Sequence, residues 1–200
     1  MDSSDKSLVE SHILGQKAAF AELVRRHGDA LLRYLYRTTG NRQTAEDLFQ
    51  ETFRRVHEKA NSFNGNNFRS WLYAIATNLA INEFRKRKRR PEISLEHIAE
   101  SKNAKCENGN CQFVETLTAN EKTEPGAQIL REELKTRVWA AVNSLPAKQR
   151  LTLVMAYYQQ MKYSEIADVL GCSTGAVKTH MFRALKHLRR VLPDGPGGAL

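Results

Sequence analysis

Apolar residues recur at helical spacing in two blocks of this sequence, and a stretch without such spacing separates the blocks. In residues 17–90, and again in residues 127–191, apolar side chains return every three or four positions, which places them on one face of a helix. No segment shows the sustained alternation of apolar and polar residues that is typical of a half-buried strand. The pattern predicts an all-α chain with two small helical domains.

Glycine, proline and polar runs divide each block into separate helices. The helices that the pattern predicts are 17–37, 44–60, 68–90, 127–144, 147–159, 163–170 and 174–191. The predicted domain organisation is a first domain at 1–91, an acidic linker at 92–126, a second domain at 127–193 and a disordered tail at 194–200.

Charge follows the same division. Residues 1–91 carry 17 Lys/Arg and 10 Asp/Glu, residues 92–126 carry 3 and 7, and residues 127–200 carry 11 and 5. Two basic blocks favour a polyanionic partner, because each cation that neutralises a phosphate releases a condensed counterion. The acidic segment between them lacks periodicity and is predicted to be a flexible linker.

Several classes of protein are disfavoured by what the sequence lacks. No apolar run reaches the roughly 20 residues that cross a bilayer, and the N-terminus has no secretory signal pattern, so we expect a cytoplasmic protein without membrane insertion. Three cysteines do not form a disulfide framework. Carboxylates are scattered and no phosphate-binding glycine loop is present, so we expect neither an enzyme nor a bound cofactor.

The predicted helix at 68–90 has two useful faces. One is apolar and must be buried; the other carries an aromatic ring, two amides and two guanidinium groups. The residues of this second face are Trp71, Asn78, Asn82, Arg85 and Arg89. Amides pair with adenine edges, guanidinium groups with guanine or phosphate, and an aromatic ring stacks on an unpaired base. The face therefore predicts nucleic-acid binding, with burial of Trp71 in the core as the alternative.

The predicted helices at 163–170 and 174–191 have the layout of a helix-turn-helix. Gly171 supplies the backbone freedom of a sharp turn, and Ser173 or Thr174 can cap the second helix. The outward face of that second helix carries Lys178, Thr179, Phe182, Arg183 and Lys186. Such a face is typical of a recognition helix in the major groove; the alternative is a helical hairpin with a basic exterior.

Four motifs, in order along the chain, resemble those of the extracytoplasmic-function (ECF) sigma factors of the sigma-70 family. Asp47-Leu48-Phe49-Gln50-Glu51-Thr52-Phe53 resembles the family's D-x-x-Q-E-x-F motif, and residues 68–78 resemble its F-x-x-W-L-x-x-I-A-x-N segment. Residues 145–150 look like its L-P-x-x-x-R start, and residues 175–184 resemble its G-T-V-K-S-R-x-x-R-A recognition helix. The resemblance implies sigma region 2 in the first domain and sigma region 4 in the second.

The resemblance also implies roles for individual residues. Asp47, Gln50 and Glu51 would dock on core RNA polymerase, and the face that contains Asn78 and Asn82 would read the −10 element of promoter DNA. A base flipped from the non-template strand would be held by the loop of Ser62, Phe63, Asn64, Gly65, Asn66 and Asn67. The −35 element would be contacted by Lys178, Thr179, Phe182, Arg183 and Lys186. An inhibitory anti-sigma protein is a further implied partner.

Two positions depart from the family pattern. Many members carry Asp where this chain has Asn82, which affects the preferred −10 bases, and a basic residue is common where this chain has His180. Cys106 and Cys111 lie close enough in sequence for a disulfide, but the spacing is wider than in common zinc ribbons, and we expect no metal.

Two other functions are consistent with parts of the sequence. A stand-alone transcriptional regulator would use the helix-turn-helix but leaves the first 90 residues without a role. An RNA-binding adaptor would use the basic blocks, but no strand module with exposed aromatic residues is predicted. A sigma factor accounts for both blocks.

Overall fold

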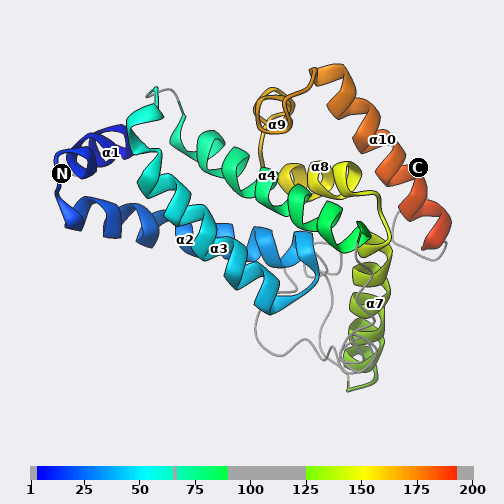
Figure 1. The fold of residues 1–200 in the computed structure, drawn as a ribbon. Helices are drawn as coiled ribbons and strands as arrows, with labels where there is room; N and C mark the ends of the chain where they lie inside the picture. The colour runs from blue at the N-terminus through cyan, green and yellow to red at the C-terminus, as the bar shows by residue number, and fades with distance from the viewer. Residues whose placement is uncertain (1–3, 65–66, 90–124, 193–200) are drawn as a thin grey trace.

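The computed structural model describes residues 4–64, 67–89 and 125–192. All regular secondary structure in these ranges is helical, which confirms the all-α prediction. Figure 1 shows a group of helices from the first half of the chain lying beside a group from the second half. Residues 92–124 of the predicted linker and the predicted tail lie outside the described residues.

The first group contains α1 (Asp5–Ile13), α2 (Lys17–Thr39), α3 (Arg42–Glu58), the 3-10 turn η1 (Ala60–Ser62) and α4 (Phe68–Arg89). The second group contains α7 (Pro125–Asn143), α8 (Ala147–Tyr157), α9 (Tyr163–Leu170) and α10 (Thr174–Val191). The seven helices predicted from apolar spacing are all present, each with ends within two residues of the prediction. α1 was not predicted.

α1 is short and is held at its N-terminal end and along one side. Ser4 caps it by accepting a hydrogen bond from the Ser7 amide at 3.2 Å, and Leu8 and Val9 are buried against the first group. Asp5 Oδ2 lies 2.8 Å from His27 Nε2 on α2. The burial of Leu8 and Val9 and the contact of Asp5 with His27 involve other helices, so the spacing within nine residues gave little sign of them.

α2, α3 and α4 build the core of the first group. Leu23, Leu31 and Leu35 of α2 are fully buried together with Leu72 and Ala76 of α4. The last two belong to the apolar face predicted for this helix, and their burial turns the polar face of α4 outward.

The helix-turn-helix forms as predicted. Gly171 ends α9 in the left-handed region with φ +59°, which a residue without a Cβ adopts without strain. Ser173 then caps α10 by accepting from the Ala176 amide at 3.2 Å. Val177 and Met181 are buried, which orients the opposite face of α10 toward solvent.

The two groups share one apolar core. α9 packs on α4 and α8 packs on α2, so Leu151, Val154 and Ile166 join the same buried cluster as Leu72. A smaller cluster lies between α7, α8 and α10. The periodicity within each block predicted two units but carried no information about this contact between them.

Candidate nucleic-acid interface

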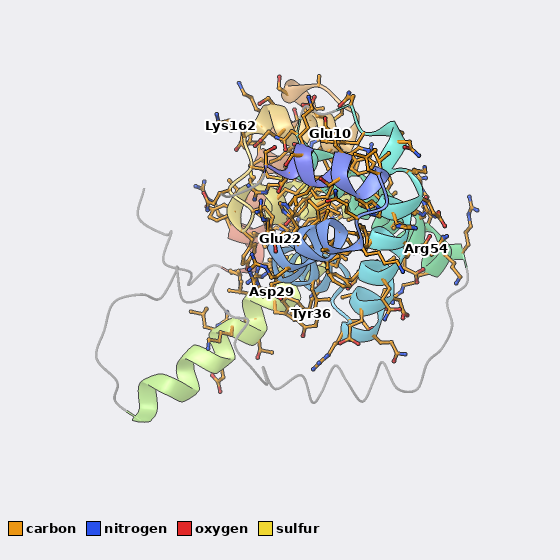
Figure 2. All side chains as sticks on the ribbon, turned by 90° about the vertical axis from the view of Figure 1, so that its left-hand side faces the viewer. Glu10, Glu22, Asp29, Tyr36, Arg54 and Lys162 are labelled. Atoms are coloured by element: carbon orange, nitrogen blue, oxygen red, sulfur yellow. The ribbon has the colours of Figure 1, made fainter. Side chains whose placement is uncertain are left out.

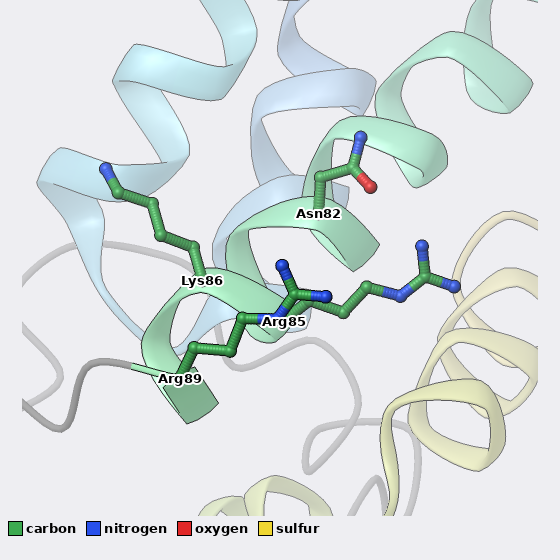
Figure 3. Close-up of a pocket in the computed structure, with 4 residues that line it drawn as sticks. All are labelled: Asn82, Arg85, Lys86 and Arg89. Atoms are coloured by element: carbon green, nitrogen blue, oxygen red, sulfur yellow. The ribbon is translucent and has the colours of Figure 1, made fainter.

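α4 presents its predicted polar face to solvent. Asn78, Asn82, Arg85 and Arg89 are all exposed, and within the described ranges none of them has an internal hydrogen-bond or ion-pair partner. Asn82, Arg85 and Arg89 line one open concavity with Lys86, and Figure 3 shows Arg85 and Lys86 extending in opposite directions from the helix. The face offers amide and guanidinium donors that are free to bind an outside partner.

The basic residues at the end of α4 differ in their contacts: one packs against α3, and three others are exposed. Arg87 turns inward: its Nε donates to Glu83 Oε1 at 3.1 Å, and its Nη2 donates to Thr44 Oγ1 on α3. Arg85, Lys86 and Arg89 remain exposed. Sequence alone did not distinguish these residues, because six consecutive basic residues surround the helix on all sides.

Trp71 is not a free stacking platform. It is half-buried in a cluster of aromatic rings, with its centroid 5.3 Å from that of Phe63 and 5.9 Å from that of Phe68. Phe63 belongs to the predicted base-capture loop, so the cluster fixes one end of this loop on α4. Trp71 therefore differs from Asn78, Asn82, Arg85 and Arg89, which are exposed.

The two ends of the base-capture loop are held by local hydrogen bonds. Ser62 Oγ donates to the Lys59 carbonyl at 2.7 Å, and Asn67 Oδ1 accepts from the Ser70 amide at 3.0 Å, which caps α4. Asn64 is exposed between them. Gly65 and Asn66 lie outside the described residues.

α10 carries the second predicted surface. Lys178, Thr179, Phe182, Arg183 and Lys186 are all exposed. Phe182 is 68% exposed, an unusual state for a large apolar side chain on a helix with a well-packed inner face. The Thr179 hydroxyl donates to the Gly175 carbonyl at 3.0 Å, and the residue is exposed.

His180 lies at the edge of this surface and is partly buried. Its Nδ1 is buried without a hydrogen-bond partner in the part of the chain that the structure describes. Burial, and then the charges of Lys148 and Arg183, lower the pKa of the His180 imidazole below its usual value. The ring is therefore neutral near pH 7 and contributes no cation where the family commonly has one.

A third surface lies on α3. Asp47 and Gln50 are exposed, and Glu51 is partly buried by its arginine neighbours. Arg54 Nε donates to Glu51 Oε2 at 2.7 Å and Arg55 Nε donates to Glu51 Oε1 at 2.7 Å. These two guanidinium groups hold the pKa of the Glu51 carboxyl at about 2, so it remains ionised throughout the physiological range.

The described residues contain neither a cluster of metal-ligating side chains nor a helix that could span a membrane. No three His, Cys, Asp or Glu side chains converge there, and none of the helices combines the length and apolarity that a membrane span requires. Cys172 is a half-buried free thiol in the helix-turn-helix. Cys106 and Cys111 fall outside the described residues.

Comparison with protein families finds two matches, one in each group of helices. Residues 23–90 match the family described as Sigma-70 region 2. Residues 135–188 match the family described as Sigma-70, region 4. The first match covers α3 and α4, and the second covers α10 as far as residue 188, so each of the three surfaces lies in a matched segment.

Two relatives extend the similarity over nearly the whole chain. The chain is 32% identical to the ECF RNA polymerase sigma factor SigW of Bacillus subtilis over 97% of its own length and 100% of SigW. It is also 32% identical to the ECF RNA polymerase sigma factor BldN of Streptomyces coelicolor, over 94% of its own length and 65% of BldN.

A solved structure has the same fold. It is that of the sigma factor RpoE of Bartonella quintana in complex with the anti-sigma factor NepR. The TM-score is 0.60 at 24% identity, over 88% of this chain and 97% of RpoE.

Proposed function

This chain belongs to the ECF sigma factors of the sigma-70 family, and we propose that it binds core RNA polymerase and directs it to promoters by reading a −10 and a −35 element. The observation that carries the proposal is the pair of exposed cationic surfaces on α4 and α10, one in each matched region. A stand-alone regulator would use only the second surface. It would leave the first without a role.

The α4 surface is assigned to the −10 element. The free amides of Asn78 and Asn82 have the donor and acceptor pattern that pairs with adenine, and Arg85 and Arg89 lie further along the same face. Since guanidinium groups also bind phosphate, these two arginines hold the DNA while the amides select the bases.

The loop of residues 62–67 is assigned to capture of a flipped base. The aromatic cluster of Phe63, Phe68 and Trp71 anchors the loop on α4, and Trp71 is only partly buried in it. Stacking and pocket contacts offset an unstacking cost of a few kcal/mol, so captured bases favour open DNA without nucleotide hydrolysis.

The α10 surface is assigned to the −35 element. A helix-turn-helix places its second helix in the major groove, where exposed Lys178 and Arg183 reach phosphates and base edges. Phe182 provides an apolar contact of the kind that recognises a thymine methyl group. The neutral His180 lowers the charge of this surface relative to the common family pattern.

The α3 surface is assigned to core polymerase. Asp47 and Gln50 are free to bind, whereas the arginines around Glu51 set its orientation. Figure 2 shows Arg54, beside this surface, on the opposite side of the molecule from Lys162 at the start of α9. Docking at α3 therefore does not compete with the contact between the two groups of helices.

An anti-sigma protein is a further proposed partner. Support comes from RpoE, a protein of the same fold whose structure contains the anti-sigma factor NepR.

The docking assignment is tested by charge reversal at two exposed aspartates. Asp47→Lys on α3 should weaken binding to core polymerase by tenfold or more, measured by fluorescence titration of labelled protein. Asp29→Lys on α2 makes the same change of charge at an exposed position outside the surface and should bind as the unmodified protein does. Equal affinities of the two variants would contradict the assignment.

A further inference from the structure

Gln159, two residues after the end of α8, joins the two groups of helices through both its side chain and its backbone. Its side chain is buried, with 6% of its surface exposed, and its Oε1 accepts a hydrogen bond from the Tyr73 hydroxyl on α4 at 2.5 Å. Its backbone carbonyl accepts from Arg69 Nη2, also on α4, and its Nε2 lies 3.4 Å from the Ala30 carbonyl on α2. One residue of the second group thus contacts two helices of the first.

The Tyr73 hydroxyl is a reliable donor in this contact. Burial raises the pKa of the Tyr73 phenol to about 12, so the hydroxyl keeps its proton under all physiological conditions. Because Tyr73 is 1% exposed, water cannot take the place of Gln159 as long as the groups remain packed.

Ring and cation contacts also join the two groups of helices. The Arg37 guanidinium lies over the Tyr158 ring at 3.8 Å from its centroid, and Arg37 is only 4% exposed. On the α7 side, the rings of Tyr36 and Trp139 are stacked with centroids 5.3 Å apart. These contacts also join α2 to the second group, so the packing is continuous from α9 to α7.

The same contact reaches the base-capture loop. Asn67 Nδ2 donates to Glu165 Oε1 on α9 at 3.3 Å. Glu165 is fixed there, since its Oε2 accepts from the Lys162 amide at 2.8 Å. A carboxylate of the second group is therefore held against the end of a loop that we assign to DNA, where it repels phosphate.

The packed arrangement brings the two DNA surfaces close together. α4 contacts α8, and α8 contacts α10, so two interhelical steps of about 8–10 Å each separate the helices that carry them. Elements centred at −10 and −35 lie about 25 base pairs apart, or ~85 Å of B-DNA. Both surfaces are exposed in this arrangement, but they cannot engage both elements of one promoter.

We propose that the contact centred on Gln159 is an intramolecular latch, which holds the free protein closed and must open before both promoter elements are read. This inference rests on the proposed function of α4 and α10. The α3 surface is exposed in the closed form, so core polymerase can dock there first and then stabilise the open form.

One charged residue reduces the free-energy advantage of the closed form over the open form. Arg150 on α8 lies over the Phe84 ring at 4.8 Å from its centroid, and its Nε is buried without a partner among the described residues. Burial, and then the charge of Arg87, lower the pKa of the Arg150 guanidinium. When the two groups of helices separate, the Arg150 guanidinium is hydrated again. This favourable hydration offsets part of the free energy lost with the packing contacts.

The latch is tested by the distance between two spin labels in the full-length chain. Labels go on cysteines at Ala21 of α2 and Arg189 of α10, both exposed and outside the proposed binding surfaces, with Cys106, Cys111 and Cys172 replaced by serine. The free protein should show one short, narrow distance distribution, and core polymerase should lengthen it by roughly 20 Å or more.

Tyr73→Phe removes the hydroxyl without removing the ring, and should raise the ratio of open to closed protein about fivefold. Tyr163→Phe removes a tyrosine hydroxyl at an exposed position and serves as the matched control. A broad distribution in the free protein, or equal distributions for the two variants, would overturn the latch. If the proposed function alone is wrong, the free protein is still closed and Tyr73→Phe still opens it, but polymerase changes nothing.

Discussion

The Tyr34 hydroxyl on α2 lies 2.7 Å from Thr77 Oγ1 on α4, and both residues are completely buried. This polar pair fixes the rotation of α4 about its axis, since an apolar face alone tolerates small rotations. Thr77 is followed directly by Asn78, which faces solvent. The buried pair thus sets the direction in which the proposed −10 surface points.

Removal of either hydroxyl of this buried pair should destabilise the protein. Thr77→Val leaves the Tyr34 hydroxyl without its partner in the core and should lower the free energy of unfolding by ~1–3 kcal/mol, measured by urea denaturation. The double variant Tyr34→Phe/Thr77→Val should lose less free energy of unfolding than the sum of the losses of the two single variants, because neither hydroxyl of the pair is then left without its partner. Strict additivity would argue against a coupled pair.

Asn82→Asp should change which bases are preferred in the −10 element. The amide of Asn82 both donates and accepts, which suits adenine, whereas a carboxylate only accepts and suits cytosine. In a selection from a randomised −10 library, the preferred base should therefore change at one or two positions, by ~1–3 kcal/mol in relative affinity. An unchanged preference would show that Asn82 does not contact a base.

Two residues of α10 should separate base reading from phosphate binding. Arg183→Ala should weaken binding of the polymerase complex to its own −35 sequence by ~1–3 kcal/mol, with little effect on unrelated sequences. Lys186→Ala should weaken binding to all sequences and reduce the salt dependence by about one counterion. Anisotropy titrations at several salt concentrations measure both effects; identical behaviour of the variants would contradict the division.

Acid should destabilise the protein through His180. Its pKa is lowered in the folded state, so the unfolded chain binds a proton first as pH falls. Neutral His180 therefore makes its full contribution to stability above the imidazole pKa of the unfolded chain, about 6.5. This contribution is lost as the pH falls toward the lower pKa of His180 in the folded protein. Between pH 7.5 and 5.5, His180→Gln should lose less stability in urea denaturation than the unmodified protein. Equal losses would rule out His180 as the source.

Replacement of Gln160 by glycine should raise the free energy of unfolding of the protein. It is the non-glycine residue with positive φ in the described chain, at φ 50°, in the turn between α8 and α9. Gln160→Gly relieves this strain but loses the bond from Gln160 Nε2 to the Tyr157 carbonyl, so we expect a net gain of about 0.5–1 kcal/mol. Gln160→Ala keeps the strain and should be less stable than the unmodified protein in the same urea titration.

Sequence predicted the parts of this fold that depend on nearby residues. The ends of α9 and α10 were predicted correctly because Gly171 and Ser173 act within a single turn. The exposed faces of α4 and α10 also followed from spacing, since their apolar residues leave only one direction for the polar ones.

Contacts between distant segments were not predictable in this way. Gln159 and Arg37 are polar, so nothing in their sequence neighbourhood indicates burial, yet the packing of the two groups buries both. Trp71 joined the outward face of α4 by helical projection, but Phe63 and Phe68 partly cover it. The residues that bury Gln159 and Arg37 come from other elements, and so does Phe63, whereas Phe68 lies on α4 itself, one turn before Trp71.

Transcription from defined templates tests the central claim most directly. Core polymerase should be given this chain and a library of promoter-containing DNA, and the 5′ ends of the transcripts should be mapped. We expect initiation at discrete sites that share one −10 and one −35 sequence, absent without the chain. The account is contradicted if the chain binds core polymerase yet yields no start site beyond those of the core enzyme alone.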